Sequence, residues 1–76
     1  MKLEPGDIVQ LTRKAIAYDL DHYNGSMFSK FNFPMRVVKR TGYLVFLQSP
    51  DPRYSIVNEG WLEKATARET ALFQLK

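Results

Sequence analysis

Residues Lys14–Pro34 read KAIAYDLDHYNGSMFSKFNFP, and this stretch decides how the chain folds. Apolar residues take alternate positions on both sides of Asn24-Gly25, and an Asn-Gly pair between two alternating segments is a strong signal for a β-hairpin. A two-residue turn at this pair sets Tyr18 opposite Phe31, so that two aromatic side chains face each other across the strands. The stretch therefore predicts a long hairpin, with these residues on its buried face: Ile16, Tyr18, Leu20, Phe31 and Phe33.

A helix is the alternative interpretation of residues 14–23. Ile16, Leu20 and Tyr23 are spaced i, i+4 and i+7, which places them on one helix face. The same Asn24-Gly25 pair could end such a helix, because both residue types accept the left-handed conformation that often follows a last helical turn. The hairpin is preferred, because a helix leaves the alternation after the turn unexplained.

The rest of the chain predicts five short strands separated by turn residues. The strands are expected at residues 7–12, 35–40, 43–48, 54–57 and 61–65. Turns are marked by Pro5-Gly6, by Thr41-Gly42 and by the loop Ser49–Arg53, which is rich in proline, serine and aspartate. The strand Tyr43–Gln48 is apolar without alternation, so both of its faces are expected to be covered.

The C-terminal residues predict a short helix. Thr66 and Glu69 match a capping box, in which the threonine hydroxyl accepts from the Glu69 amide and the carboxylate accepts from the Thr66 amide. The apolar stripe of this helix is made of Ala71, Leu72 and Leu75, with Ala67 and Phe73 near its edge. About ten residues do not form a stable helix alone in water. The helix is therefore expected to dock on the strands or on a partner, and one candidate assembly is a homo-oligomer formed through it.

Size and composition predict one soluble domain over residues 1–76. Apolar residues make up 45% of the chain, as in a folded globule. No apolar run approaches the roughly 20 residues of a membrane span, and Met1–Asp7 carry an acid and a Pro-Gly pair where a signal peptide has its hydrophobic region. Cysteine is absent, which suits a reducing compartment. We therefore expect a cytoplasmic protein without a membrane partner.

The predicted order of strands and turns resembles the Src-homology-3-like small β-barrels. Residues 6–11, Gly-Asp-Ile-Val-Gln-Leu, are similar to the opening strand of bacterial and phage members, and residues 57–63, Val-Asn-Glu-Gly-Trp-Leu-Glu, to the short helical turn and closing strand. The hairpin over residues 13–33 takes the place of the long first loop that binds peptides in signalling members. The resemblance implies a mainly β fold, with a five-stranded barrel over residues 5–65, a long hairpin after the first strand and a short α-helix over residues 66–76.

The sequence carries no pattern typical of catalysis or of a bound cofactor. His22 is the only histidine, and in the hairpin register it points to the face opposite Asp21, which argues against a catalytic triad. Residues 19–30 only partly follow a calcium loop, because Asn24 takes the place of its glycine and Lys30 that of its glutamate. The glycines are single residues at turns rather than a phosphate-binding loop. We therefore expect a protein that is not an enzyme and binds no cofactor or metal.

Aromatic residues at the predicted hairpin tip indicate a protein-binding surface. Tyr23 and Phe28 lie on the face opposite the buried one, and exposed aromatic side chains on a rigid turn are typical anchors for a protein partner. Asp19 and Asp21 add acidic groups to the same hairpin, with Asp19 opposite Lys30. The leading hypothesis is a small non-catalytic module that binds a protein partner, as an adaptor, accessory subunit or inhibitor.

A basic strand face supports an alternative function. If Met35 and Val37 enter the core, Arg36 and Arg40 project outward about 13 Å apart. Exposed arginines beside an aromatic side chain are typical of single-stranded nucleic-acid binding, through phosphate neutralisation and base stacking. The net charge of +3 is modest, and acids are interspersed among the bases. The residues of this alternative nucleic-acid surface are Arg13, Lys14, Arg36, Lys39, Arg40 and Tyr43.

Overall fold

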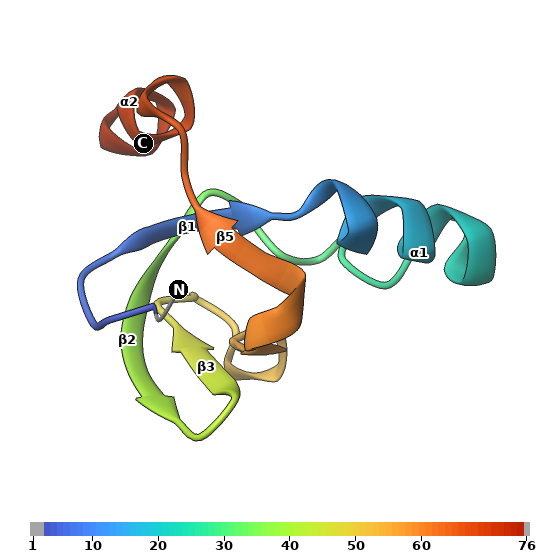
Figure 1. Cartoon of the computed structure of the whole chain (residues 1–76), viewed down its shortest axis with the longest axis horizontal. Helices are drawn as coiled ribbons and strands as arrows, with labels where there is room; N and C mark the ends of the chain where they lie inside the picture. Colours follow the sequence, from blue (N-terminus) through green and yellow to red (C-terminus); the bar gives the residue numbers. More distant parts are fainter. Residues whose placement is uncertain (1–2, 76) are drawn as a thin grey trace.

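A computed structural model describes residues 3–75 (Figure 1). Its strands are β1 (Ile8–Leu11), β2 (Met35–Thr41), β3 (Leu44–Leu47), β4 (Ile56–Asn58) and β5 (Leu62–Lys64). Its helices are α1 (Arg13–Tyr23) and α2 (Ala67–Gln74), and its 3₁₀ turns are η1 (Pro52–Tyr54) and η2 (Glu59–Trp61). Met1, Lys2 and Lys76, which the predicted domain range includes, lie outside the described residues.

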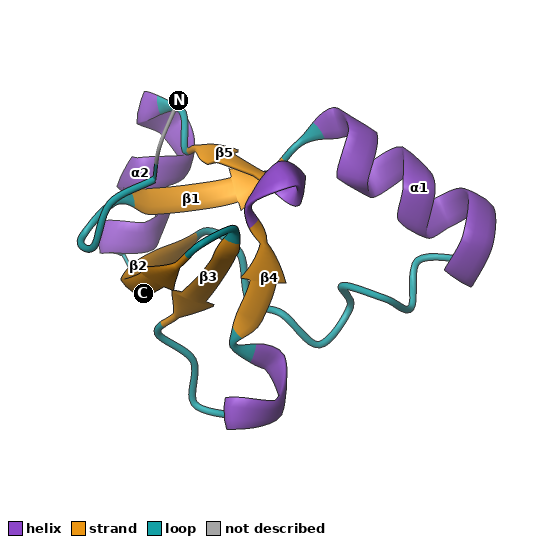
Figure 2. Ribbon diagram, turned by 60° about the horizontal axis from the view of Figure 1, so that its bottom comes forward, coloured by secondary structure: helices purple, strands orange, loops and turns teal. Residues whose placement is uncertain are grey.

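The strands form one antiparallel sheet in the order β4-β3-β2-β1-β5. β4 and β5 are the two ends of this order, yet only η2 separates them along the chain, so the sheet curls strongly. Within residues 3–75 these two end strands do not pair with each other, and Figure 2 shows β4 at a margin of the sheet. The prediction of five strands is confirmed, whereas the predicted closed barrel is wrong, because the sheet remains open between β4 and β5.

The inner face of the curled sheet carries the hydrophobic core. Residues two apart in a strand share a face, and Met35 and Val37 of β2 both point inward, as predicted. The buried apolar side chains are Leu3, Val9, Ala15, Phe28, Met35, Val37, Val45, Leu47, Val57 and Leu62. Phe31 and Phe33 are partly buried against them. A domain this small buries only about 60% of the surface of its unfolded chain, so each of these side chains is a large part of the core.

The predicted hairpin is wrong, and residues 13–23 form the helix α1 instead. The helix begins after Thr12, whose side-chain oxygen accepts from the amide of Ala15 at 3.0 Å, the usual contact of an N-cap. It ends at Asn24, whose φ of 53° and ψ of 33° lie in the left-handed region that commonly follows a last turn. Because both ends are capped, the helix alternative is correct and the expected cross-strand pairs are lost.

Helix α1 packs on the rest of the protein through a narrow stripe. Ala15 and Asp19, one turn apart, are its buried residues, and the helix projects away from the sheet in Figure 1. The prediction that Ile16, Tyr18 and Leu20 belong to the core is wrong, because all three are exposed, Leu20 by 59%. Strand residues and Phe28 already fill the core, so most of the apolar face of α1 stays outside it.

A β-bulge changes the expected faces of β2. The register with β3 shifts between Val37 and Lys39, so that Arg40 pairs with the buried Val45. Residues directly opposite each other point to the same face of a sheet, and an extra residue in a strand reverses the alternation beyond it. The prediction that Arg36 and Arg40 project from one face is therefore wrong.

Only one face of β3 is covered. Val45 and Leu47 are buried, whereas Leu44 is exposed and Tyr43, just before the strand, is 67% exposed. The prediction that both faces of Tyr43–Gln48 are covered is therefore wrong. Apolar side chains often remain on a protein surface, so an apolar run alone does not separate a strand with two buried faces from one with a single buried face.

The predicted start of α2 is confirmed. Thr66 Oγ1 accepts from the amide of Glu69 at 3.2 Å. The other half of the expected capping box is replaced, because the Thr66 amide donates to Gln10 Oε1 at 3.3 Å. Gln10 in turn donates from Nε2 to the Glu63 carboxylate at 2.6 Å. The helix is thus tied to β1 through the side chain of Gln10.

Helix α2 packs through the edge of its predicted apolar stripe rather than through the centre. Ala71, Leu72 and Leu75 are exposed, Leu75 by 82%. Phe73, at the edge of the stripe, is half-buried, and its ring centre lies 5.4 Å from the guanidinium carbon of Arg36. The centre of the stripe therefore does not dock on the strands, and its docking on a partner stays a prediction.

Candidate functional site

Aromatic rings from four parts of the chain form one continuous cluster. Trp61 of η2 lies 5.0 Å from Tyr18 of α1 and 6.4 Å from Phe28, measured between ring centroids. Phe31 lies 5.8 Å from Phe28 and 5.8 Å from Tyr54 of η1. Edge-on and tilted pairs at these separations are favourable arrangements for aromatic rings. The aromatic cluster consists of Tyr18, Phe28, Phe31, Phe33, Tyr54 and Trp61.

Asp19 positions the part of the cluster that follows α1. Its two carboxylate oxygens accept from the backbone amides of Met27 at 2.8 Å and of Phe28 at 3.2 Å. The side chain is only 6% exposed, and a buried carboxylate is stable in a fold only when hydrogen bonds or charges satisfy it. The helix thereby holds the chain that reverses after Gly25, and this contact sets Phe28 against Trp61.

The structure separates the four residues predicted to bind a protein. Tyr23 and Asp21 are exposed on the last turns of α1, so their accessibility agrees with the prediction. Phe28 is only 8% exposed and belongs to the core, so its predicted role as an exposed anchor is wrong. The prediction that Asp19 is a surface acid opposite Lys30 is wrong as well, because its carboxylate is occupied by two backbone amides.

A groove of about 290 Å³ runs between residues 24–34 and β4. It is lined by Met27, Phe28, Phe31, Ile56, Val57, Asn58 and Trp61, which we call the aromatic groove. Figure 2 shows the loop that leaves α1 passing on the open side of β4. All three residues of β4 line this groove, and most of its other walls are aromatic or thioether side chains. It is therefore an apolar recess built from segments that are far apart in the sequence.

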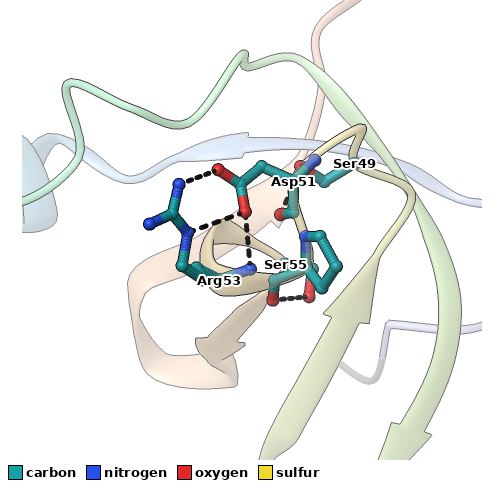
Figure 3. Close-up of polar contacts among 5 residues, drawn as sticks. Ser49, Asp51, Arg53 and Ser55 are labelled. Carbon is teal, nitrogen blue, oxygen red and sulfur yellow. Dashed lines mark hydrogen bonds and ion pairs between the residues drawn. The ribbon is translucent and has the colours of Figure 1, made fainter.

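The loop before β4 supports one wall of the aromatic groove (Figure 3). The Asp51 carboxylate accepts from the backbone N of Arg53 at 3.0 Å, from Nε at 3.1 Å and from a terminal guanidinium nitrogen at 2.9 Å. Ser55 Oγ donates to the carbonyl of Pro52 at 2.7 Å. These contacts fix η1, so that its last residue, Tyr54, meets Phe31 edge-on.

Hydrogen bonding in this loop shifts the pKa values of Asp51 and Arg53. The pKa of Asp51 is lowered from its ordinary value, first by the side-chain hydrogen bonds from Arg53 and then by the backbone amide of the same residue. The pKa of Arg53 is raised for the matching reason. The pair lies at the surface, where water and salt screen it. It therefore orders the loop locally and contributes little to global stability.

Of the residues that line the groove, the sequence identified only Phe28 as a partner-binding residue. Trp61 was expected in the closing strand, whereas it ends the 3₁₀ turn η2, which Asn58 caps by accepting from the Gly60 amide at 2.8 Å. The expectation of a short helical turn before the last strand agrees with η2. The contact between Trp61 and Tyr18 could not be predicted, since it depends on α1.

The residues of the alternative nucleic-acid surface do not form one patch of free cations. Arg40 forms an ion pair with Glu59, with 2.8 Å between nitrogen and oxygen. Arg36 lies over the ring of Phe73, and Lys39 Nζ lies 4.7 Å from the ring centre of Phe46. The remaining members are exposed at other places, namely Arg13 and Lys14 at the start of α1 and Tyr43 in the β2–β3 turn.

A second hollow is a weaker candidate site than the aromatic groove. It measures about 420 Å³, and the described residues that line it are Glu4, Pro5, Arg40 and Gly42. Arg40, the one cation among these described residues, is already paired with Glu59. The hollow lacks the converging apolar walls with a few polar groups that are typical of binding pockets, so it carries no functional argument.

His22 and the nearby acids do not form a chemical centre with one another. The ring of His22 stacks on Tyr18 at 4.1 Å, and its Nδ1 lies 3.1 Å from the carbonyl oxygen of the same tyrosine, one turn earlier. Within residues 3–75, no group of three or more histidine, aspartate or glutamate side chains is placed to hold a metal ion. The aromatic groove is therefore a better candidate site than the surroundings of His22.

Comparison with protein-family models, with curated proteins and with solved structures gives no significant match to this chain. The resemblance to Src-homology-3-like barrels therefore stays a prediction. Neither α1 nor α2 is long and apolar enough to cross a membrane, and this holds for every helix among the described residues.

Proposed function

We propose that this chain is a non-catalytic binding module that holds a segment of a protein partner in the aromatic groove. The observation that carries the proposal is the groove itself, which offers Met27, Phe31 and Trp61 around a recess of about 290 Å³. Aromatic residues and methionine are enriched where proteins contact each other, and charged residues are depleted there. An apolar side chain of a partner would lose contact with water in this recess, and that transfer supplies binding energy.

The lining of the recess favours a protein partner over a small molecule. Small-molecule pockets usually combine apolar walls with a few placed polar or charged groups, and among the described residues that line this groove only Asn58 is polar. Three of the lining residues belong to β4, at the edge of the sheet. Such a module could serve as an adaptor, an accessory subunit or an inhibitor.

Nucleic-acid binding is the alternative, and one observation favours it. Lys39 and Arg36 are exposed on β2, and the Lys39 ammonium lies over the ring of Phe46. An exposed cation next to a ring is an arrangement that binds single strands through phosphate contacts and stacking. The removal of Arg40 from this set by its ion pair weakens the alternative.

Selection from a displayed library of random peptides tests the proposed function. We expect peptides to be enriched on the wild-type protein and to lose about tenfold or more in affinity with Ile56→Lys, because a charge would then stand in the groove. Ile56 is half-exposed, so the substitution leaves the core intact. Leu44→Lys is the matched control, since Leu44 is also exposed, on the neighbouring strand, and does not line the groove.

Two outcomes would contradict the proposed function. One is a selection that enriches no peptide, and the other is an enriched peptide that both variants bind equally well. The alternative predicts instead that a single-stranded oligonucleotide binds with a steep salt dependence. That binding would be lost with Arg36→Ala and Lys39→Ala combined and retained with Ile56→Lys.

A further inference from the structure

The aromatic groove follows an open edge of the sheet. Within residues 3–75, β4 pairs with β3 on one side and has no strand on the other. Leu47 donates its amide to the carbonyl of Ser55 at 2.6 Å, so the backbone groups of Ser55 face β3. Groups that face the neighbouring strand alternate along an antiparallel strand. The backbone N–H and C=O groups of Ile56 therefore face the open side, as does the N–H of Asn58, whereas the carbonyl of Asn58 belongs to the start of η2, which Asn58 caps.

We propose that β4 binds an extended peptide segment as an added strand, with one large apolar side chain in the aromatic groove and an acidic side chain beside Lys14. This inference rests on the proposed function and names the conformation and the chemistry of the partner segment. Addition of a strand to an exposed edge uses main-chain hydrogen bonds for affinity and pockets for alternate side chains for specificity. The edge of β4 and the groove beside it offer both.

The orientation of Val57 decides which side chain of the partner enters the groove. Val57 points to the inner face and is buried, whereas Ile56 and Asn58 on either side of it are exposed. Side chains opposite each other share a face, so the partner residue opposite Val57 points toward Phe28 and Trp61. Its two neighbours in the added strand point outward beside Ile56 and Asn58. We therefore expect the partner segment to carry a single apolar residue flanked by polar ones.

Charge complementarity specifies the neighbouring residue of the partner. Lys14 lines a hollow of about 220 Å³ together with Asn58, Gly60 and Trp61. Asn58 and Trp61 also line the aromatic groove, so Lys14 lies beside the end of the groove that Asn58 marks. The chain has a net charge of +3. A segment with an aspartate or glutamate near its apolar residue is therefore favoured over a basic one.

A second copy of this chain fits the same edge less well. The edge of β4 is only three residues long, and residues 24–34 stand across the groove from it. A second sheet carries its own residues 24–34 beside its own β4, so each copy would have to accommodate two such loops. A short peptide carries no such loop.

Amide exchange of the wild-type protein, alone and with a synthetic peptide of the most enriched library sequence, tests the inference. We expect the peptide to slow exchange at the amides of Ile56 and Asn58 about tenfold or more, and to leave Val57, which faces β3, unchanged. Methylation of each peptide amide in turn should weaken binding at alternate positions only. Lys14→Glu should lower the affinity for an acidic peptide about fivefold or more. Arg13→Glu, at the neighbouring exposed position, should lower it less.

The outcomes separate this inference from the proposed function. One result would overturn strand addition but leave the proposed binding module in place. In that result, binding of the peptide requires the Ile56 side chain, exchange at the backbone amide of Ile56 is not slowed, and methylation of the peptide is tolerated at every position. Enriched peptides that are basic rather than acidic, or equal effects of Lys14→Glu and Arg13→Glu, would also overturn it. If sedimentation instead shows a dimer that Ile56→Lys dissociates, the occupant is a second copy and the proposed peptide is wrong.

Discussion

Asp19 shows how one side chain controls the geometry of the groove. Its carboxylate joins α1 to the backbone of Met27 and Phe28 through two acceptor oxygens. Asparagine, the amide of the same length, offers only one acceptor oxygen. The loop that forms a wall of the groove therefore depends on a polar contact rather than on apolar packing alone.

Replacement of Asp19 should destabilise the protein. Asp19→Ala leaves two buried amides without their acceptor, which costs about 1 to 3 kcal/mol in the free energy of unfolding. Asp21→Ala, on the same helix but exposed, should change it by less than about 0.5 kcal/mol. Urea denaturation of both variants measures the difference. Equal effects would mean that the carboxylate of Asp19 does not hold the loop.

Asp51 should titrate below its ordinary pKa. The hydrogen bonds from Arg53 favour the ionised carboxylate, so the folded pKa lies below the unfolded one. The resulting stabilisation of the loop is present above the unfolded pKa and is lost as the pH falls through the folded pKa. An NMR titration should show the pKa of Asp51 rising toward its ordinary value in Arg53→Gln. An unchanged pKa in that variant would contradict the contacts drawn in Figure 3.

At the scale of elements, turn and cap chemistry could be predicted from the sequence, and the choice between helix and strand could not. Gly42 and the Thr66–Glu69 pair lie at the expected turn and helix start. The stretch before Asn24 satisfies two periodicities at once, and the alternation favoured the hairpin. The N-cap that Thr12 supplies to α1 was not among the signals that entered this choice. The helix is formed because its caps and Asp19 satisfy backbone groups, although its apolar face remains outside the core.

Removal of the cap of α2 should weaken this helix. Thr66→Ala deletes the acceptor of the Glu69 amide, and the loss of such an N-cap costs about 1 kcal/mol. Thr66→Ser keeps the acceptor and should be close to the wild type. Thermal unfolding, followed by circular dichroism, compares the two variants. If Thr66→Ala unfolds at the wild-type temperature, the helix contributes nothing to the stability of the domain.

At the scale of the whole molecule, the five strands and their places along the chain could be predicted, whereas the open sheet and the site could not. Phe28 and Trp61 are remote in sequence, and they meet because α1 and its buried carboxylate bring the following loop across the sheet. No local pattern encodes that contact. The curled but open sheet also leaves β4 with a free edge, which a closed barrel would have removed.

Deletion of residues 67–76, a segment whose last residue lies outside the described part, should lower the melting temperature. Phe73 lines a small recess with Pro34 and Met35, so its removal exposes apolar surface of a thin core to water. Calorimetry of the shortened chain measures the change. An unchanged melting temperature together with the loss of an oligomer would assign α2 to an interface between copies, as its exposed Leu72 and Leu75 allow.

The aromatic cluster gives the protein an internal optical reporter. Trp61 is the only tryptophan, and it both lines the groove and lies 5.0 Å from Tyr18. Light absorbed by that tyrosine will reach the indole by energy transfer, and the emission colour of the indole follows the amount of water around it. Occupation of the groove would displace that water and shift the emission toward the blue, so affinity can be read by fluorescence without a dye or a tag.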